Sequence, residues 1–168
     1  MLMTNMTEAA LIQQIYEAFK GTKLEEGIGL FEADCIDDHL NPTHPDYIYW
    51  KHKDERHEWE KLLPLFMSSN AIERLNSSNY FFMDAKGKRF HMPCYFLQDL
   101  DPRFSGNNPV ITDIRFKNNE LSAYQLLSPL QKETLVAFLE FQIDKFMREE
   151  NEIDFEMYTE AKNILLSI

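Results

Sequence analysis

The sequence predicts a mainly α protein, a single-domain helical bundle over residues 1–168 with at most a small hairpin or extended segment. Apolar residues recur at three- and four-residue spacing in several segments, which is the period of an amphipathic helix. The run Ser128-Pro129-Leu130-Gln131 has the form of a capping box with proline in the first turn, a strong signal for a helix start. Five glycines and seven prolines are too few for a turn-rich β architecture.

The first expected element is an amphipathic helix near the N-terminus. Its apolar stripe consists of residues 11, 12, 15, 16 and 19. Thr7 suits the N-cap position, and Gly21 suits the left-handed residue that ends a helix. A long loop is expected over residues 22–48, because glycines and prolines interrupt this stretch. Loops of this length in compact domains are often functional or are ordered by a partner.

A charged helix is expected from Asp46 onward, and Pro64 would either kink it or begin a new helix. A short helix is expected at residues 70–75. Residues 80–88 then suggest either a short hairpin or two helices joined by a tight turn, with Gly87 as the flexible position.

The next helix is expected after Pro93, and residues 110–116 suggest one strand or an extended linker, because they are rich in β-branched and aromatic side chains. A long helix should begin at the capping box. Residues 149–152 are expected to interrupt it, and Asp154 is expected to cap a last amphipathic helix. The long helix should bury six apolar side chains: Leu130, Leu135, Ala137, Phe138, Phe141 and Phe146.

Negative charge is distributed unevenly along the chain. The formal net charge is −11, and residues 24–60 alone hold eleven acidic and three basic residues, a net charge of −8. Residues 61–127 carry a net charge of +2, and residues 128–168 carry −5. Such a field attracts basic surfaces and repels phosphate, so we expect a basic protein as the partner and do not expect nucleic acid.

Two cysteines, Cys35 and Cys94, are too few for a disulfide framework and are expected to be buried thiols in a reducing compartment. The first 23 residues lack the basic and apolar regions of a signal peptide. No apolar run approaches the roughly 20 residues that cross a bilayer. We therefore expect a soluble, cytoplasmic protein without a membrane partner.

Two motifs together resemble those of a known protein family. Residues 90–97, Phe-His-Met-Pro-Cys-Tyr-Phe-Leu, are similar to its "rfylPaYll" motif. Residues 127–131, followed by Val-Ala-Phe-Leu-Glu at 136–140, are similar to its "LsPeQ…vaaFLe" motif. With Trp59 upstream, they resemble a family of small uncharacterised bacterial cytosolic proteins over roughly residues 55–147. The resemblance implies a mostly helical domain, and it brings no activity, cofactor or catalytic residue.

Chemically reactive side chains gather at two places. The first combines sulfur, carboxylate and imidazole groups that could bind zinc, although the spacing matches no standard zinc pattern. Its members are Cys35, Asp37, Asp38, His39 and His44. At the second place, Cys94 would be a nucleophile with His91 as its base. The family motif has a small alanine at the position of Cys94, which favours packing.

The expected function is a non-enzymatic protein-binding module, for example an immunity or antitoxin protein that neutralises a basic toxin or effector. Two alternatives stay open: a metal-binding protein or small hydrolase-type enzyme that uses Cys35, His39 and His44, and a homo-oligomeric module without separable activity. No catalytic residue, metal ligand or cofactor is assigned. The acidic residues and aromatic anchors expected to bind the partner are Asp34, Asp37, Asp38, Asp46, Tyr47, Tyr49, Trp50, Asp54, Glu55 and Glu58.

Overall fold

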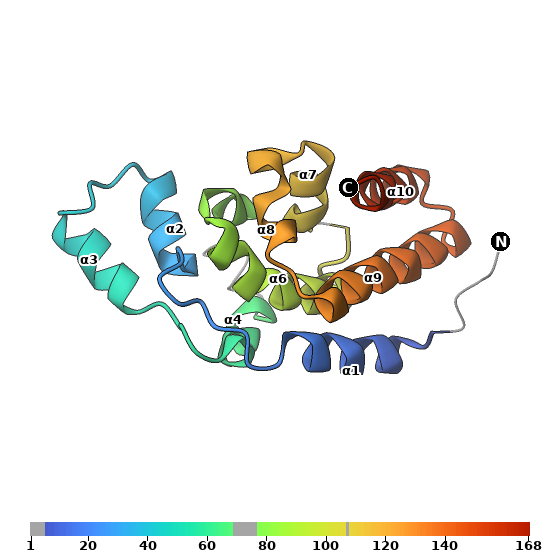
Figure 1. Cartoon of the computed structure of the whole chain (residues 1–168), viewed down its shortest axis with the longest axis horizontal. Coiled ribbons are helices and arrows are strands. Elements are labelled where there is room, and N and C mark those ends of the chain that lie inside the picture. Colours follow the sequence, from blue (N-terminus) through green and yellow to red (C-terminus); the bar gives the residue numbers. More distant parts are fainter. Residues whose placement is uncertain (1–5, 69–76, 107) are drawn as a thin grey trace. The chain divides into compact units, whose positions relative to one another are not determined.

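The computed structural model describes residues 6–68, 77–106 and 108–168 (Figure 1). Helices form all of the regular structure over these ranges, and no strand occurs within them. The prediction of a mainly α protein is therefore confirmed. The helix predicted at residues 70–75 lies outside the described residues.

The helices below are those of the described residues. In chain order they are α1 (Glu8–Phe19), α2 (Leu30–Asp37), α3 (Pro45–His52), η1 (Trp59–Leu62), α4 (Leu63–Phe66), η2 (Ser77–Phe82), α6 (Ala85–Leu100), α7 (Pro109–Arg115), η3 (Asn118–Leu121), α8 (Ser122–Gln125), α9 (Pro129–Arg148) and α10 (Glu152–Leu166), where η marks a 3-10 helix.

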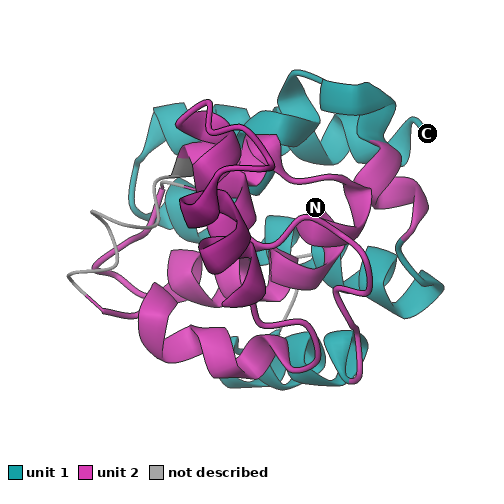
Figure 2. Ribbon diagram, turned by 90° about the vertical axis from the view of Figure 1, so that its left-hand side faces the viewer, with its two compact units in different colours: residues 1–20, 110–121, 127–168 teal, residues 21–109, 122–126 magenta. Residues whose placement is uncertain are grey.

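The chain divides into two compact units, each assembled from separate stretches of sequence (Figure 2). The first unit contains α1, α7, α9 and α10, and the second contains α2, α3, α4, α6 and α8. The expectation of a single domain over residues 1–168 stays a prediction.

In the first unit, α9 packs against both α1 and α10. The amide of Gln14 on α1 donates to the Thr134 hydroxyl of α9 at 3.2 Å, and the rings of Phe146 and Tyr158 meet edge to face at 5.0 Å across α9 and α10. The apolar stripe of α1 is buried against these helices at Leu11, Ile15 and Phe19.

The local helix signals of the sequence are confirmed. Ser128 accepts from the Gln131 amide at 3.2 Å while the Gln131 side chain accepts from the Ser128 amide at 3.0 Å, which completes the capping box. Thr7 caps α1 by accepting from the Ala10 amide at 3.2 Å. Gly21 follows α1 with φ of +72°, the left-handed conformation that glycine adopts without strain.

Three expectations for the first unit are wrong. Residues 110–115 form most of helix α7 and are not extended, because Val110, Ile111 and Ile114 are buried at helical spacing. Leu130 is 45% exposed, since it lies in the first turn of α9. Asn151 and not Asp154 caps α10, through a 3.3 Å bond from the Asp154 amide.

In the second unit, the nearly buried helix α6 packs against η1, α4 and α8. It begins at Ala85 and not after Pro93, which lies in its interior. Asp84 caps it by accepting from the Gly87 amide at 2.8 Å. Gly87 is therefore helical and marks no flexible turn. A Cβ at this position would lie 2.2 Å from the Ile28 carbonyl oxygen, so the glycine permits close packing of the loop before α2 against α6.

The expected loop and charged helix over residues 22–66 are also corrected. Residues 30–37 form α2, and α3 ends at His52. Residues 53–58 contain no helix, and Pro64 lies in the first turn of the short helix α4.

The capping box predicts a specific loss of stability. Ser128→Ala should lower the free energy of unfolding by about 1 kcal/mol, because the Gln131 amide loses its acceptor. Ser128→Asp is the matched control, since it keeps a capping oxygen and should stay near wild type. Urea denaturation of the three proteins makes the comparison, and equal stability of Ser128→Ala and wild type would contradict the role of the cap.

Candidate partner-binding surface

Helix α2 takes its N-terminal cap from a residue that is distant in sequence. The Asp54 carboxylate accepts from the Phe31 amide at 2.7 Å and from the Glu32 amide at 3.1 Å. The N-cap residue of α2 is Gly29, which has no side chain to do this. Asp54 follows α3 in the chain, so one carboxylate ties the segment after α3 to the start of α2.

Gly29 makes this contact possible. A Cβ at Gly29 would lie 2.2 Å from the carboxyl carbon of Asp54 and 2.6 Å from its Cβ. Any other residue would displace the carboxylate from the first amides of α2. The glycine, which the sequence suggested as a loop signal, is therefore required by the close approach of Asp54.

Glu32 connects α2 to α3. Its side chain is buried, and it accepts from the Tyr47 hydroxyl at 2.8 Å and pairs with the Lys51 ammonium at 2.9 Å. Arg56 approaches the other carboxylate oxygen at 4.0 Å. Burial, together with the neighbouring Glu32 carboxylate, raises the pKa of Tyr47, so its hydroxyl stays a hydrogen-bond donor.

Burial dominates the electrostatics of Asp54. It raises the pKa of this carboxyl from 3.8 to about 6, although the amides of Phe31 and Glu32 and the charge of Arg56 act in the opposite direction. The charge of Glu32 raises the value further.

The structure removes four of the ten expected residues from an open binding surface. Asp54 and Tyr47 are buried in the contacts described above. Glu55 accepts from the amides of His57 and Glu58 at 2.9 and 3.1 Å and so closes the turn after α3. Glu58 pairs with Lys61. These acids shape the backbone or are neutralised within the chain.

The carboxylates of α2 and the first turn of α3 remain accessible. Asp34, Asp38 and Asp46 are exposed, while Asp37 is half-buried and accepts from the Ser78 hydroxyl at 2.9 Å. Partial burial raises the pKa of Asp34, and the charges of Asp38 and Asp37 add to this, while the polar side chain of Asn79 opposes it. Asp34 and Asp38 thus lie close enough to repel each other.

Helix α3 exposes three consecutive large side chains. Ile48 is 57%, Tyr49 54% and Trp50 39% exposed. The Trp50 ring contacts Tyr49 with centroids 5.1 Å apart and contacts Phe31 of α2 at 5.5 Å. The Lys53 ammonium lies 5.3 Å from the centre of the Tyr49 ring.

We call this region the α2–α3 surface. It includes two residues that sequence reasoning missed, Phe31 and Ile48. The run Ile48-Tyr49-Trp50 could have indicated that Ile48 is exposed. Three consecutive apolar residues of a helix point in directions too different to share one buried face. The α2–α3 surface consists of Phe31 and Asp34 from α2, its C-cap residue Asp38, and Ile48, Tyr49 and Trp50 from α3.

The proposed zinc ligands do not form a site. Over residues 6–68, 77–106 and 108–168, no three His, Cys, Asp or Glu side chains are placed to hold a metal ion. Cys35 is buried, and burial raises the pKa of its thiol. His44 accepts from the Asp46 amide at 3.1 Å and caps α3, while His39 is exposed with φ of +58°.

Cys94 and His91 are part of the core of the second unit. The Cys94 thiol donates to the Trp59 carbonyl at 3.5 Å, and burial raises its pKa well above 9.0. Burial lowers the pKa of His91 to about 4, and its Nδ1 lies 2.8 Å from the Gly87 carbonyl oxygen. A protonated thiol beside a neutral imidazole already bound to the backbone fits packing better than nucleophilic catalysis.

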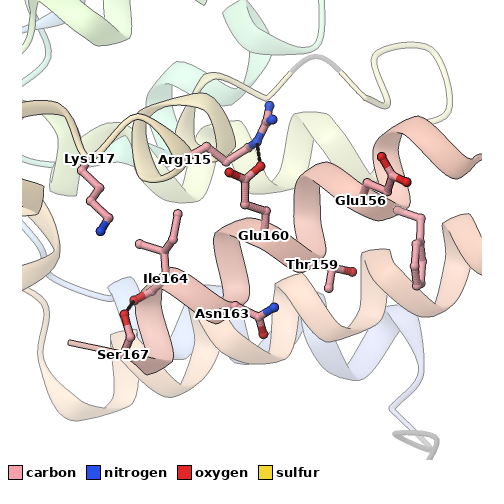
Figure 3. Close-up of a pocket in the computed structure, with 9 residues that line it drawn as sticks. Arg115, Lys117, Glu156, Thr159, Glu160, Asn163, Ile164 and Ser167 are labelled. Atoms are coloured by element: carbon pink, nitrogen blue, oxygen red, sulfur yellow. Dashed lines mark hydrogen bonds and ion pairs between the residues drawn. The ribbon is translucent and has the colours of Figure 1, made fainter.

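The first unit has an open groove of about 660 Å³ between the end of α7 and α10 (Figure 3). Arg115 pairs with Glu160 at 2.6 Å on its wall. Lys117 and Glu156 also line it, so cations and carboxylates are balanced there. The groove has no charge preference that would select a basic or an acidic partner.

A comparison with protein families identifies the family of the chain. A family model described as a family of unknown function, DUF6714, matches residues 7–163. The chain belongs to the DUF6714 family. This match confirms the expectation of an uncharacterised family, and it includes every residue of the α2–α3 surface. Neither a curated protein nor a solved structure matches the chain. Within the part of the chain that the structure describes, no helix has both the length and the apolar character to cross a bilayer.

The contact between Gly29 and Asp54 can be tested by a double-mutant cycle. Gly29→Ala should lower the free energy of unfolding by about 2 kcal/mol, because the new methyl group overlaps the Asp54 side chain. In an Asp54→Gly background the same substitution should cost much less, since the atoms that it meets are gone. Urea denaturation of the four proteins measures the coupling, and equal costs in both backgrounds would contradict the close approach.

The raised pKa of Asp54 predicts a pH-dependent stability. A pKa near 6 in the folded chain, above the ordinary 3.8, means that the folded state holds this proton more tightly. The contribution of Asp54 to stability should therefore be greatest below about pH 4 and be lost as the pH rises to about 6. The free energy of unfolding of wild type minus that of Asp54→Asn should fall over this interval and be flat above it.

Titration of the Asp54 carboxyl carbon by NMR measures the same pKa directly in the wild-type protein. A midpoint below about 4, or a stability difference that rises with pH, would show that the two amides and Arg56 outweigh burial.

Proposed function

We propose that this chain is a non-enzymatic, cytoplasmic protein-binding module that docks a basic protein through the α2–α3 surface. The proposal rests on one observation: Tyr49 and Trp50 of α3 are exposed, and Trp50 contacts Phe31 of α2, the helix that carries the exposed Asp34. Among the residues that the structure describes, neither Asp34 nor Asp38 forms an ion pair with lysine or arginine.

Ion pairs within the chain concentrate the remaining negative charge on α2. Lys86 pairs with Glu25 at 2.6 Å and also with Glu26, and Lys51 pairs with the buried Glu32. Of these two lysines only Lys86 lies outside residues 24–60, so it offsets one unit of their net charge of −8. The exposed acids of α2 are left to act on a partner, and complementary charge would speed its association.

The aromatic residues of α3 would supply binding energy that charge alone does not. Tyrosine and tryptophan are enriched among the residues that dominate binding energy, because each buries a large area with few rotatable bonds. Tyr49 and Trp50 are both exposed in the free protein. A hydrophobic centre surrounded by a polar, solvent-accessible rim is the usual composition of a protein interface.

A specific form of this function is that of a bacterial immunity or antitoxin protein that covers a basic surface of a toxin or effector. The size of 168 residues, the net charge of −11 and the exposed aromatic helix support it. The alternative of a metal-binding protein or hydrolase has no support in the geometry, because Cys35, His39 and His44 are not placed as ligands of one ion.

The partner can be captured by a photo-crosslinking residue at position 49 in the native host and identified by mass spectrometry. We expect a basic protein. With the purified pair, Asp34→Asn/Asp38→Asn should slow association about tenfold at low salt, and high salt should reduce the difference. Glu149→Gln/Glu152→Gln is the matched control, since it removes two exposed carboxylates of the first unit and should leave association unchanged.

An acidic partner, or association that is insensitive to salt and to the α2 variants, would contradict the proposal. The immunity form has its own test, co-expression with the captured partner. Protection of cell growth by wild type and its loss with Tyr49→Ala/Trp50→Ala support that form, and a partner that is harmless when expressed alone overturns it.

A further inference from the structure

We infer that the partner presents two arginine side chains about one helical turn apart, one stacked on Trp50 and the other between Asp34 and Asp38. This inference rests on the proposed function and specifies the partner's chemistry. It follows from the order in which aromatic and acidic groups occur along the α2–α3 surface.

Helix α2 carries these groups on one face. Phe31, Asp34 and Asp38 are spaced by three and four residues, the spacing of neighbours on a helical surface. With a rise of about 1.5 Å per residue, Asp34 and the C-cap residue Asp38 lie roughly 4.5 and 10.5 Å along the axis from Phe31. Because Asp34 and Asp38 repel each other, a cation between them relieves that repulsion.

The aromatic end of this face is shared with α3. The rings of Phe31 and Trp50 are in contact, with centroids 5.5 Å apart. Trp50 therefore lies near the N-terminal end of α2, and the carboxylates follow toward the C-terminal end. Trp50 keeps 39% of its surface exposed and offers an accessible ring. The neighbouring Tyr49 ring already has Lys53 at 5.3 Å, which shows that rings of α3 accept a cation in this setting.

Arginine fits both positions better than lysine. Its planar guanidinium stacks on an aromatic ring and also forms paired hydrogen bonds with carboxylates, whereas an ammonium acts as a compact point charge. Counted along α2 from Phe31, whose ring contacts Trp50, the first carboxylate, Asp34, is about one helical turn away. An extended segment matches this with arginines at alternate positions, since residues i and i+2 of a strand are about 6.6 Å apart.

The probe is therefore a short blocked peptide with the sequence Gly-Arg-Ser-Arg-Gly. Three comparison peptides each change one feature of the probe. In the first, one arginine is replaced by serine; in the second, both arginines are replaced by lysine; in the third, the two arginines are separated by five serines. Binding to the full chain is followed by NMR shifts of the Trp50 indole and by tryptophan fluorescence. Trp59 is fully buried, so the ring accessible to the peptide is that of Trp50.

We expect millimolar binding of the Arg-Ser-Arg peptide, at least about threefold tighter than that of each comparison peptide. Trp50→Ala and Asp34→Asn/Asp38→Asn should each weaken it severalfold. Phe116→Ala is the matched aromatic control, because Phe116 is 69% exposed in the first unit and should not affect binding. Backbone NMR spectra of each variant show whether α2 and α3 keep their fold.

Equal affinity for the single-arginine or widely spaced peptide, or shifts centred on residues outside α2 and α3, would overturn the inference. Failure here is distinguishable from failure of the proposed function. If the cross-linked partner still depends on the α2–α3 surface while the peptide does not bind there, docking stands and the arginine pair is wrong. If the partner does not use this surface, both are wrong.

Discussion

The Asp54 carboxylate is the contact on which the α2–α3 surface depends. Helix α2 begins at a glycine and has no side-chain cap of its own, so its first free amides are bound by a residue that follows α3. This contact closes residues 29–54 into one structural segment. Glu32, whose amide Asp54 binds, extends the network through Tyr47 and Lys51. Because of these links, α2 and α3 present their outer faces together.

Acidic residues have two different uses in the second unit. Some carboxylates organise the backbone: the buried Asp54 caps α2, and the half-buried Asp84 accepts from the amides of Ile28 and Gly87 at 3.0 and 2.8 Å, which holds the loop before α2 against α6. The exposed Asp34 and Asp38 are not used in this way and would contribute to the field that the proposed partner meets. Net charge alone does not separate these uses, although they have opposite consequences for binding.

Sequence reasoning succeeded where the signal and the structure are both local. The ends of α1 and α9 were predicted from Thr7, Gly21 and the capping box, because each cap binds an amide within three residues. Helix α2 was missed because its cap comes from residue 54. The β-branched residues of α7 favour an extended segment, although their spacing also suits a helix. Packing in the first unit decides for the helix, because it buries Val110, Ile111 and Ile114. Of the residues of the α2–α3 surface, the sequence suggested Tyr49, Trp50, Asp34 and Asp38, whereas Phe31 needed its contact with α3 to be recognised.

The sequence by itself determined the mainly α class, the boundaries of the locally capped helices and the concentration of acids between residues 24 and 60, because helical period, caps and charge are properties of neighbouring residues. Only the tertiary structure decided which acids face solvent and which glycines are needed for close packing. Burial depends on residues far apart in the chain, as Gly29 and Asp54 show: a carboxylate that would add to a docking surface instead lies inside it and supports the helix that carries the exposed ones.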